Sequence, residues 1–205
     1  MTSVRPERGL LMTGPLVLQT IAGAKTETRR IGDRYRKWKR GDRIYVRETY
    51  RAMCRVADPD CYCDDEQHHW VEYKADTGNP RPGDWPADDP DAPHWKPSIH
   101  MPKWAARVWL ELVEDVAYEP LQDITEDGAK AEGVTVGEPM PATVNGVAGE
   151  VTYFNPRVAF AHLWSRINGK RGPADDPERF TWARNPEVVV LRFRVVSTDG
   201  RQLNV

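Results

Sequence analysis

The feature that most constrains the fold is a long polar interruption of the core-forming sequence, from about residue 51 to 97. This stretch is rich in proline, aspartate and glycine, and it contains all three cysteines of the chain. Connections without secondary structure rarely exceed about 12–15 residues in a compact domain, so we expect an irregular insertion and not a plain loop. The segments on either side of it then have to supply the core.

Two core segments precede the insertion. Pro15 begins a short apolar run, and proline suits the first position of a helix because its missing N–H costs nothing there. Gly23 ends the run, since glycine readily adopts the left-handed conformation that closes helices. Residues 43–47 alternate, with Ile44 and Val46 on one face, which predicts a half-buried strand.

The segments after the insertion predict two more strands and two helices. We expect strands at 105–114 and 187–195, a short helix at 121–133, and a longer helix at 155–169 that begins at an asparagine cap. A second variable segment at about 137–153 has the composition of a mobile loop or an extra hairpin. Together these elements predict an α+β fold. A chain of this length fits one domain with insertions or two small ones, and we expect a single domain over residues 1–205.

Composition indicates a globular protein with an uneven charge distribution. Hydrophobic residues make up 40% of the 205 residues and charged residues 29%, which is enough to bury a core. The formal net charge of −2 conceals a basic segment at 25–55 and an acidic one at 58–91, and the basic face permits an anionic ligand. No apolar run is long enough to span a bilayer, and residues 1–7 show no signal region, so we expect no membrane association and a cytoplasmic location.

The insertion carries a cluster of candidate metal ligands. Cys54, Cys61, Cys63 and His68 would supply a Cys3His set, which suits tetrahedral zinc and would order a segment with little core. Their spacing matches no standard zinc finger. A structural zinc ion and free thiols on a loop therefore both remain open.

Polar side chains that could take part in catalysis or binding are most concentrated in residues 23–30, which combine an amine, two hydroxyls, a carboxylate and two guanidinium groups. A lysine beside a hydroxyl can activate a nucleophile, and arginines can hold a phosphate. Taken alone, the stretch is a solvated basic turn. Lys25 and Thr28 are three residues apart and would face opposite sides of a flat strand, so a shared site requires the chain to curve there.

Two further places carry candidate site residues. Residues 94–104 follow a path restricted by two prolines, and they either line a pocket or form a connector whose tryptophan and methionine fill the core. Glu132 lies in the last turn of a predicted helix, where the helix dipole disfavours a carboxylate by about 0.3–1 kcal/mol. This glutamate is therefore either paired with a cation or exposed.

The order of these motifs resembles a known family. A helix is followed by Gly-x-Lys-x-x-Thr-x-Arg at 23–30, a Gly-Asp turn into a strand, a helix ending in Ala-x-x-Glu-Gly, and a valine-rich last strand. This order resembles the ASCH domain family, small PUA-like β-barrels that bind RNA or nucleosides. The Trp-x-Pro-Ser-Ile-His-Met-Pro and Leu-Trp-Ser-x-Ile-Asn-Gly stretches look like the longer, phage- and prophage-type members. The resemblance covers roughly residues 9–50, 95–136 and 154–196, and it implies a barrel of about five to six strands with flanking helices.

The resemblance also implies a catalytic set. Thr28 stands where the family signature usually has glutamate, which is similar to the ASCH enzymes that remove the acetyl group from N4-acetylcytidine. By motif, the catalytic residues are then Lys25, Thr28 and Glu132, with Glu27 as a possible substitute for Glu132. The Thr28 hydroxyl would attack the acyl carbonyl, Lys25 would accept its proton, and Glu132 would orient Lys25 or carry a proton to the leaving amine. No cofactor is required.

The remaining expectations concern ligand and location. The candidate substrate-binding residues are Arg29, Arg30, Glu48, Tyr50, Ser98, His100 and Trp104. The expected ligand is a modified nucleoside or RNA, in the host cytoplasm if the chain is phage-encoded, and the sequence does not identify protein partners. Two alternatives stay open: a non-catalytic reader with Trp104 or Tyr50 stacked on the base, and a ribonuclease. Lys25 with Thr28 favours the hydrolase, because binding alone does not need a hydroxyl beside an amine.

Overall fold

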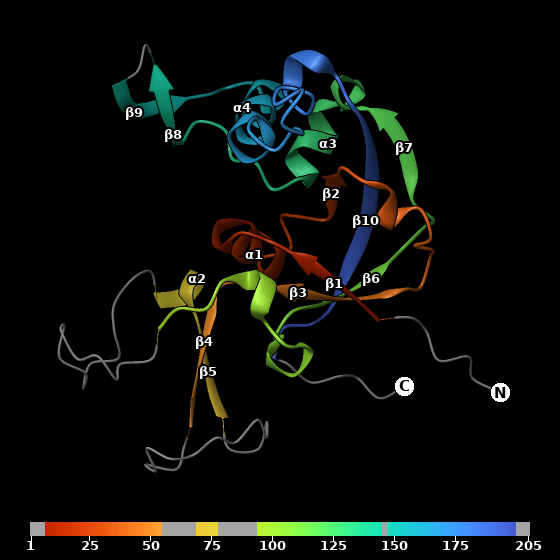
Figure 1. Cartoon of the computed structure of the whole chain (residues 1–205), viewed down its shortest axis with the longest axis vertical. Helices are drawn as coiled ribbons and strands as arrows, with labels where there is room; N and C mark the ends of the chain where they lie inside the picture. Colours follow the sequence, from red (N-terminus) through yellow and green to blue (C-terminus); the bar gives the residue numbers. More distant parts are fainter. Residues whose placement is uncertain (1–6, 55–68, 78–93, 145–146, 200–205) are drawn as a thin grey trace. The chain divides into compact units, whose positions relative to one another are not determined.

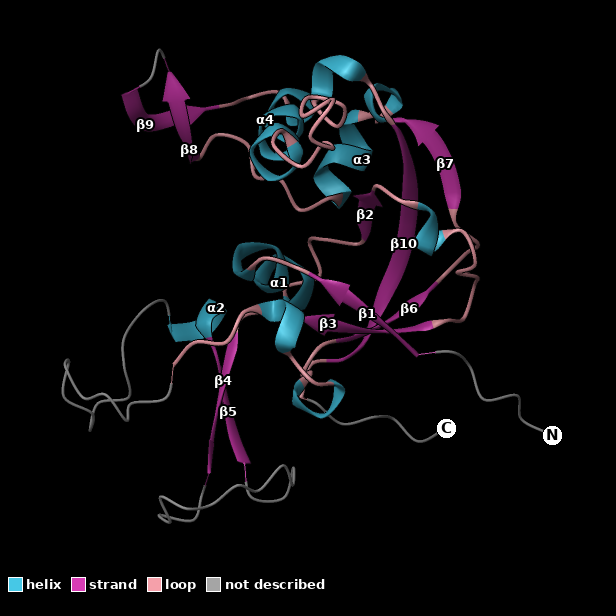
Figure 2. Ribbon diagram, in the orientation of Figure 1, coloured by secondary structure: helices cyan, strands magenta, loops and turns pink. Residues whose placement is uncertain are grey.

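The structure is a computed structural model that describes residues 7–54, 69–77, 94–144 and 147–199. The described chain combines helices with strands that pair mostly antiparallel, which confirms the α+β class (Figure 1; Figure 2). Its contacts divide into two compact units. Unit 1 comprises Met1–Ile21, Asp42–Glu111 and Val195–Val205, and unit 2 comprises Ala22–Gly41 and Leu112–Arg194. Each unit is thus assembled from separate stretches of the chain.

Unit 1 contains the N-terminal strands and the elements around the insertion. Its elements are β1 (Glu7–Leu11), α1 (Gly14–Ile21), β3 (Arg43–Arg47), β4 (Tyr50–Cys54), β5 (His69–Tyr73), α2 (Lys74–Thr77) and most of β6 (Trp109–Leu112). Strand β3 pairs parallel with β1 and antiparallel with β6. Ile44 and Val46 are buried as the alternation predicts. Strand β6 is shorter than expected, because Lys103–Ala105 forms a 3-10 turn before it.

The stretch expected to be irregular is partly ordered. Strands β4 and β5 form an antiparallel ladder from Tyr50 paired with Tyr73 to Cys54 paired with His69. The ladder is stabilised by apolar side chains, since Tyr50 belongs to a buried cluster with Met101 against which Tyr73 packs. This corrects the expectation that the chain loses regular structure at about residue 51.

The predicted zinc ligands fall mostly outside the described residues. Cys61, Cys63 and His68 lie there, and Cys54 is the last residue of β4. Within the described part of the chain, no group of three or more His, Cys, Asp or Glu side chains is arranged to hold a metal ion. The zinc site stays a prediction. In the same part of the chain, no helix combines the length and apolar character needed to cross a membrane.

Unit 2 contains the other helices and strands. Its elements are β2 (Glu27–Arg30), β7 (Ala117–Pro120), α3 (Glu126–Ala131), β8 (Pro139–Val144), β9 (Val147–Thr152), α4 (Pro156–Asn168) and most of β10 (Glu187–Ser197). Strand β10 pairs antiparallel with β2 on one side and β7 on the other. Strands β8 and β9 pair with each other, so the second variable segment adopts the hairpin alternative.

The capping residues predicted for the helices of unit 2 are in place. Thr125 Oγ1 accepts the N–H of Gly128 at 3.0 Å at the start of α3, and Asn155 caps α4 in the same way. Helix α3 is followed by Gly133 with φ of 83°, a left-handed conformation that favours glycine. The two helices pack in one apolar cluster, whose buried members are Leu121, Ile124, Ala129, Phe160, Trp164 and Val188.

Candidate functional site

The candidate site lies in unit 2, where the chain entering β2 meets the end of α3. Lys25 and Glu132 form an isolated antiparallel bridge, and the Thr26 N–H donates to the Ala131 carbonyl at 2.8 Å. The Thr125 cap and Gly133 fix the two ends of α3. These backbone contacts hold Glu132 beside β2 independently of any contact made by its side chain.

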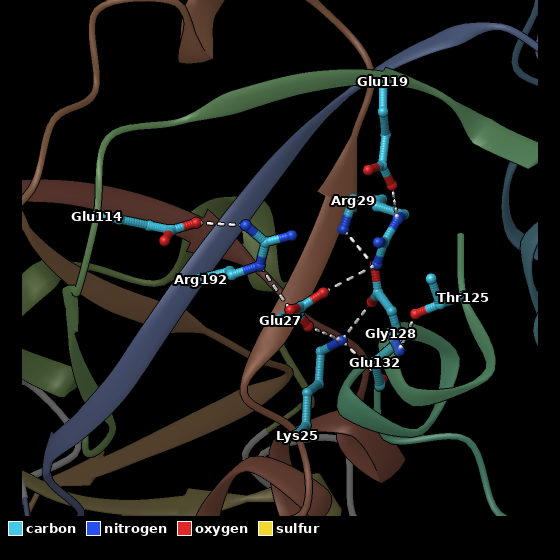
Figure 3. Close-up of polar contacts among 9 residues, drawn as sticks. All are labelled: Lys25, Glu27, Arg29, Glu114, Glu119, Thr125, Gly128, Glu132 and Arg192. Carbon is cyan, nitrogen blue, oxygen red and sulfur yellow. Dashed lines mark hydrogen bonds and ion pairs between the residues drawn. The ribbon is translucent and has the colours of Figure 1, made fainter. Parts of the chain in front are cut away.

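Lys25 is fully buried and donates three hydrogen bonds. Its Nζ lies 2.6 Å from Glu132 Oε2, 2.7 Å from the Glu132 carbonyl oxygen and 2.8 Å from the Glu27 carbonyl oxygen (Figure 3). A protonated lysine has three N–H donors. All three therefore have an acceptor, and one acceptor is a carboxylate.

The Glu132 carboxylate binds the backbone of β2 as well as Lys25. Its Oε1 accepts the backbone N–H of Arg29 and lies 3.5 Å from Arg29 Nη1. Strand β2 pairs with β10 on one edge, and an edge strand leaves N–H and C=O groups without strand partners on the other. On this edge Lys25 donates a hydrogen bond to the Glu27 C=O, and Glu132 accepts one from the Arg29 N–H. The two side chains thereby make the hydrogen bonds that a neighbouring strand would otherwise make.

Arg29 connects this pair to a larger charge network. Its guanidinium is 3% exposed and lies 2.7 Å from Glu119 and 3.3 Å from Glu27, in addition to its contact with Glu132. Glu27 also accepts a hydrogen bond from Arg192 Nε at 2.6 Å. Arg192 continues to Glu114, so that the network runs across β2 and β10 (Figure 3).

A glycine in α3 makes room for this guanidinium. A Cβ added at Gly128 would lie 3.1 Å from Arg29 Nη2 and 3.3 Å from Thr125 Oγ1. Glycine in a helix interior costs about 0.8–1 kcal/mol relative to alanine. The close approach of Arg29 to the helix accounts for a glycine at this position.

Burial lowers the pKa of Lys25 from its ordinary value of 10.5, while Glu132 opposes that change and Arg30 adds to it. The hydrogen bonds of the pair permit either charge state. If the proton moves from Lys25 to Glu132 Oε2, the neutral amine still donates to the two carbonyls and accepts from the new hydroxyl. A proton can therefore be shared within the pair without leaving a donor or acceptor unpaired.

Thr28 is buried in β2, directly before the N–H that Glu132 accepts. Side chains alternate along a strand, so Thr28 faces away from Glu27 and Arg29. Among the described residues, no hydrogen bond joins the Thr28 hydroxyl to Lys25 or Glu132. The structure thus brings Lys25 and Glu132 together. It places Thr28 next to Arg29, the residue of β2 whose backbone N–H the Glu132 carboxylate accepts.

The predicted binding residues divide between the units. Arg29 and Arg30 lie in unit 2 on β2, and the rest lie in unit 1, namely Glu48, Tyr50, Ser98, His100 and Trp104. Arg29 is bound by three carboxylates, so its guanidinium is already occupied within the protein.

The unit 1 residues have mainly structural contacts. Tyr50 is buried and its hydroxyl donates to the His100 carbonyl at 3.1 Å. Glu48 is paired with Arg107 at 2.9 Å, and burial raises the pKa of that carboxyl. Met101 is buried and Trp104 packs against the same cluster, in agreement with the core-filling interpretation of residues 94–104. Ser98 and His100 begin and end a 3-10 turn on this segment.

Several residues around the pair were not singled out from sequence, namely Glu114, Glu119, Gly128 and Arg192. One signal was present: Arg192 interrupts an apolar strand, where a charged side chain needs a partner. Comparison with known proteins found no matching family model, no similar curated protein and no similar solved structure. The resemblance to the ASCH family therefore rests on the sequence motifs.

Proposed function

We propose that the chain is an amidohydrolase that removes an acyl group from the exocyclic amine of a modified pyrimidine nucleoside or base, such as N4-acetylcytidine. The observation that carries this proposal is the buried Lys25–Glu132 pair, 2.6 Å apart, with a threonine at the adjacent position of β2. Buried ion pairs are costly to form, and titratable groups with shifted pKa values cluster at functional sites. The proposed fold is the PUA-like barrel of the ASCH family.

The proposed reaction has two steps. The Thr28 hydroxyl attacks the acyl carbonyl while Lys25, in its neutral form, accepts the hydroxyl proton. The C–N bond then breaks, the amine leaves with a proton from Glu132, and an acyl-threonine ester remains. Water hydrolyses that ester, and this returns the threonine hydroxyl and releases the carboxylic acid.

The burial of Lys25 supports this sequence of steps. A lysine acts as a base only when it is neutral, and burial lowers the pKa of Lys25. In the proposed reaction Glu132 is the group that donates a proton to the leaving amine, and its carboxyl group lies 2.6 Å from Lys25 Nζ. Thr28 has to approach Lys25 for attack, and catalytic hydrogen bonds commonly tighten only when substrate binds.

The experiment follows cytidine release from N4-acetylcytidine by chromatography. Thr28→Val keeps the branched shape and removes the hydroxyl, and we expect turnover to fall at least a hundredfold. Thr26→Val is the matched control, since Thr26 is an exposed threonine next to the same strand, and its turnover should equal that of the wild type. Turnover that survives in Thr28→Val would rule out the threonine nucleophile.

A second candidate function is a non-catalytic reader of RNA or modified bases. The observation that favours it is that Lys25 and Glu132 use their polar atoms to complete the edge of β2, which is a structural task. Nucleoside or RNA binding by the wild type without any release of cytidine would establish the reader and exclude the hydrolase. RNA cleavage that is lost in Thr28→Val and Lys25→Met would instead indicate a ribonuclease.

A further inference from the structure

The hairpin formed by β8 and β9 has no role in the proposed chemistry. The two strands form a sheet of their own, and no third strand in the described part of the chain pairs with either of them (Figure 2). Each strand therefore has an outer edge of backbone N–H and C=O groups, and such an edge is a template for another strand. The two edges differ in whether they can be used in this way.

The backbone contacts of β9 show which residues form its outer edge. The Tyr153 carbonyl accepts the N–H of Gly137 at 2.8 Å, so the backbone polar groups of Tyr153 are directed to the β8 side. This direction alternates from one residue to the next along an antiparallel strand, so the odd-numbered residues of β9 face β8. The residues that direct their N–H and C=O groups out of the hairpin are Ala148, Glu150 and Thr152.

Prolines close the outer edge of β8. Pro139 pairs with Thr152, and Pro141 pairs with Glu150. Directly opposite residues of an antiparallel pair face either both inward or both outward, so the nitrogen atoms of both prolines point out of the hairpin. A proline nitrogen has no hydrogen to donate, and prolines on an edge strand prevent the pairing of a further strand. Strand β9 contains no proline, so its outer edge alone is open.

Exposed apolar side chains adjoin the open edge. Phe154 lies two residues beyond the end of β9 and is 81% exposed. Val158, in the first turn of α4, is 50% exposed. Val136 is 42% exposed and precedes Gly137, the residue that donates to the Tyr153 carbonyl. Large apolar side chains that are exposed together mark sites of protein interaction, and here they adjoin a backbone edge that can accept a strand.

We propose that the outer edge of β9 pairs antiparallel with the same edge of a second copy of this chain, about a two-fold axis at Val151. The product is a four-stranded sheet in which the two β9 strands lie in the middle and the two β8 strands lie outside. Both outer edges of this sheet carry prolines. Pairing therefore stops at two chains, and no longer assembly forms.

The charge of Glu150 restricts the position of the axis. Hydrogen-bonded pairs of the new ladder have to join outward-facing residues of the two chains. An axis at Glu150 would place this carboxylate opposite its own copy, and like charges directly opposite each other destabilise a sheet. An axis at Val151 pairs Glu150 with Thr152 of the second copy, and an axis at Gly149 pairs it with Ala148. Both of these positions separate the carboxylates.

The exposed ring of Phe154 favours the axis at Val151. That axis places Phe154 opposite Ala148 of the second copy, whose small side chain leaves room for the ring, and each chain then covers the ring of the other. An axis at Gly149 leaves both rings beyond the end of the opposite β9. This mutual covering favours a second copy over an unrelated peptide, because the chain itself supplies the small residue opposite the ring.

The first experiment measures the oligomeric state of the full chain by sedimentation velocity over a range of concentrations. We expect a monomer–dimer equilibrium without larger species. Thr152→Pro removes an outward N–H of β9, and its dimer dissociation constant should rise at least about tenfold, because symmetric pairing loses the hydrogen bond twice. Thr143→Pro is the matched control and should dimerise as the wild type does. Thr143 is opposite Ala148, so its N–H faces the edge of β8 that prolines already close.

The outcomes separate self-pairing from other uses of the edge. A chain that stays monomeric up to about 1 mM contradicts self-pairing and leaves the open edge to an extended peptide of another protein. Equal dimerisation of Thr152→Pro and the wild type, or equal losses in both proline variants, contradicts pairing through β9. Phe154→Ala leaves the backbone of the hairpin unchanged and should also weaken the dimer.

The second experiment locates the two-fold axis by disulfide cross-linking. Val151→Cys places two thiols at the axis, where the Cα atoms of a non-hydrogen-bonded pair are about 4.5 Å apart and within disulfide range. Mild oxidation should then give a covalent dimer well above the background set by the wild type with its own cysteines.

Gly149→Cys is the control for this cross-link. A Cβ added at Gly149 would meet no described atom within 4 Å, so the hairpin accommodates the side chain. With the axis at Val151 its two copies lie four residues apart along the strands, about 13 Å, which is too far for a disulfide. Cross-linking of Gly149→Cys in place of Val151→Cys, or of neither, would overturn the proposed pairing.

Discussion

At the scale of single residues, Lys25 and Glu132 are bound so tightly to each other and to β2 that neither can be removed alone. The two side chains are 0% and 6% exposed. Removing one partner of a buried pair typically costs about 3–5 kcal/mol, because the other charge is left without compensation, whereas replacing both is often nearly neutral. The pair should therefore behave as one unit in unfolding experiments.

We predict that Glu132→Gln lowers the free energy of unfolding by about 3–5 kcal/mol. The amide oxygen can still accept the Arg29 N–H, so the loss comes from the uncompensated Lys25. The double variant Lys25→Met/Glu132→Gln should be at least about 2 kcal/mol more stable than the sum of the single effects predicts. Urea denaturation of the wild type, Lys25→Met, Glu132→Gln and the double variant measures this coupling.

The control is the exposed pair of Lys130 with Asp127, 3.2 Å apart on the same helix. Lys130→Met and Asp127→Asn should each change stability by less than about 1 kcal/mol, since exposed pairs contribute little. Additive effects at Lys25 and Glu132 would show that the pair is not the unit of stability inferred from the structure.

At the scale of secondary structure, the packing of α3 against β2 depends on Gly128. Alanine in a helix interior is ordinarily about 0.8–1 kcal/mol more favourable than glycine. Here the new methyl group would meet Arg29 Nη2, which three carboxylates hold in place. We predict that Gly128→Ala gives no stabilisation and costs up to about 1 kcal/mol, measured by urea denaturation.

A change at Arg29 tests whether this side chain causes the unfavourable effect of Gly128→Ala. Arg29→Lys keeps a positive charge and lacks the Nη2 group that the methyl would meet. In that background we expect Gly128→Ala to be about 0.5–1 kcal/mol more favourable than in the wild type, while the contacts of the methyl with Ile124 and Thr125 at 3.3 Å remain. The same cost in both backgrounds would mean that Arg29 does not set the requirement for glycine.

The elements differ in how far the sequence predicted them. Helices α1, α3 and α4 have local signals, such as Thr125 and Asn155 as caps, and these signals act over a few residues. Strand β10 was expected to bury alternate residues from Val189 onward, but Val188 and Val190 are buried too. It pairs with other strands on both edges and also contributes Val188 to the apolar cluster of α3 and α4. Neither property can be predicted from the residues of the strand alone.

The candidate site was predictable only in part, because it too depends on contacts between separate elements. The position of Glu132 near a helix end indicated a cationic partner, and motif order pointed to Lys25. The partners of Arg29 come from separate elements: Glu119 is on β7 and 90 residues away along the chain. Contacts at such separations depend on how the elements assemble, and no local pattern encodes them.

At the scale of the whole molecule, alkaline pH should act in opposite directions on the two units. In unit 2 the pKa of Lys25 is lowered in the folded chain, so between that value and 10.5 the unfolded chain binds more protons, and stability rises with pH. In unit 1 the pKa of Tyr73 is raised by burial to about 12. Its stabilising contribution is complete below pH 10 and is lost as pH rises through 12.

The Tyr73 effect is the easier one to isolate. The hydroxyl donates to the Ala105 carbonyl at 2.9 Å, and the unfolded chain ionises near pH 10 while the folded chain retains the proton. We predict that stability falls by about 1–2 kcal/mol between pH 10 and 12, a value reduced from the full shift because part of the ring is solvated. Urea denaturation across this range should show a shallower fall in Tyr73→Phe, which has no ionisable group there. Tyr118→Phe, at an exposed tyrosine, should keep the wild-type slope, and equal slopes in all three proteins would refute the assignment.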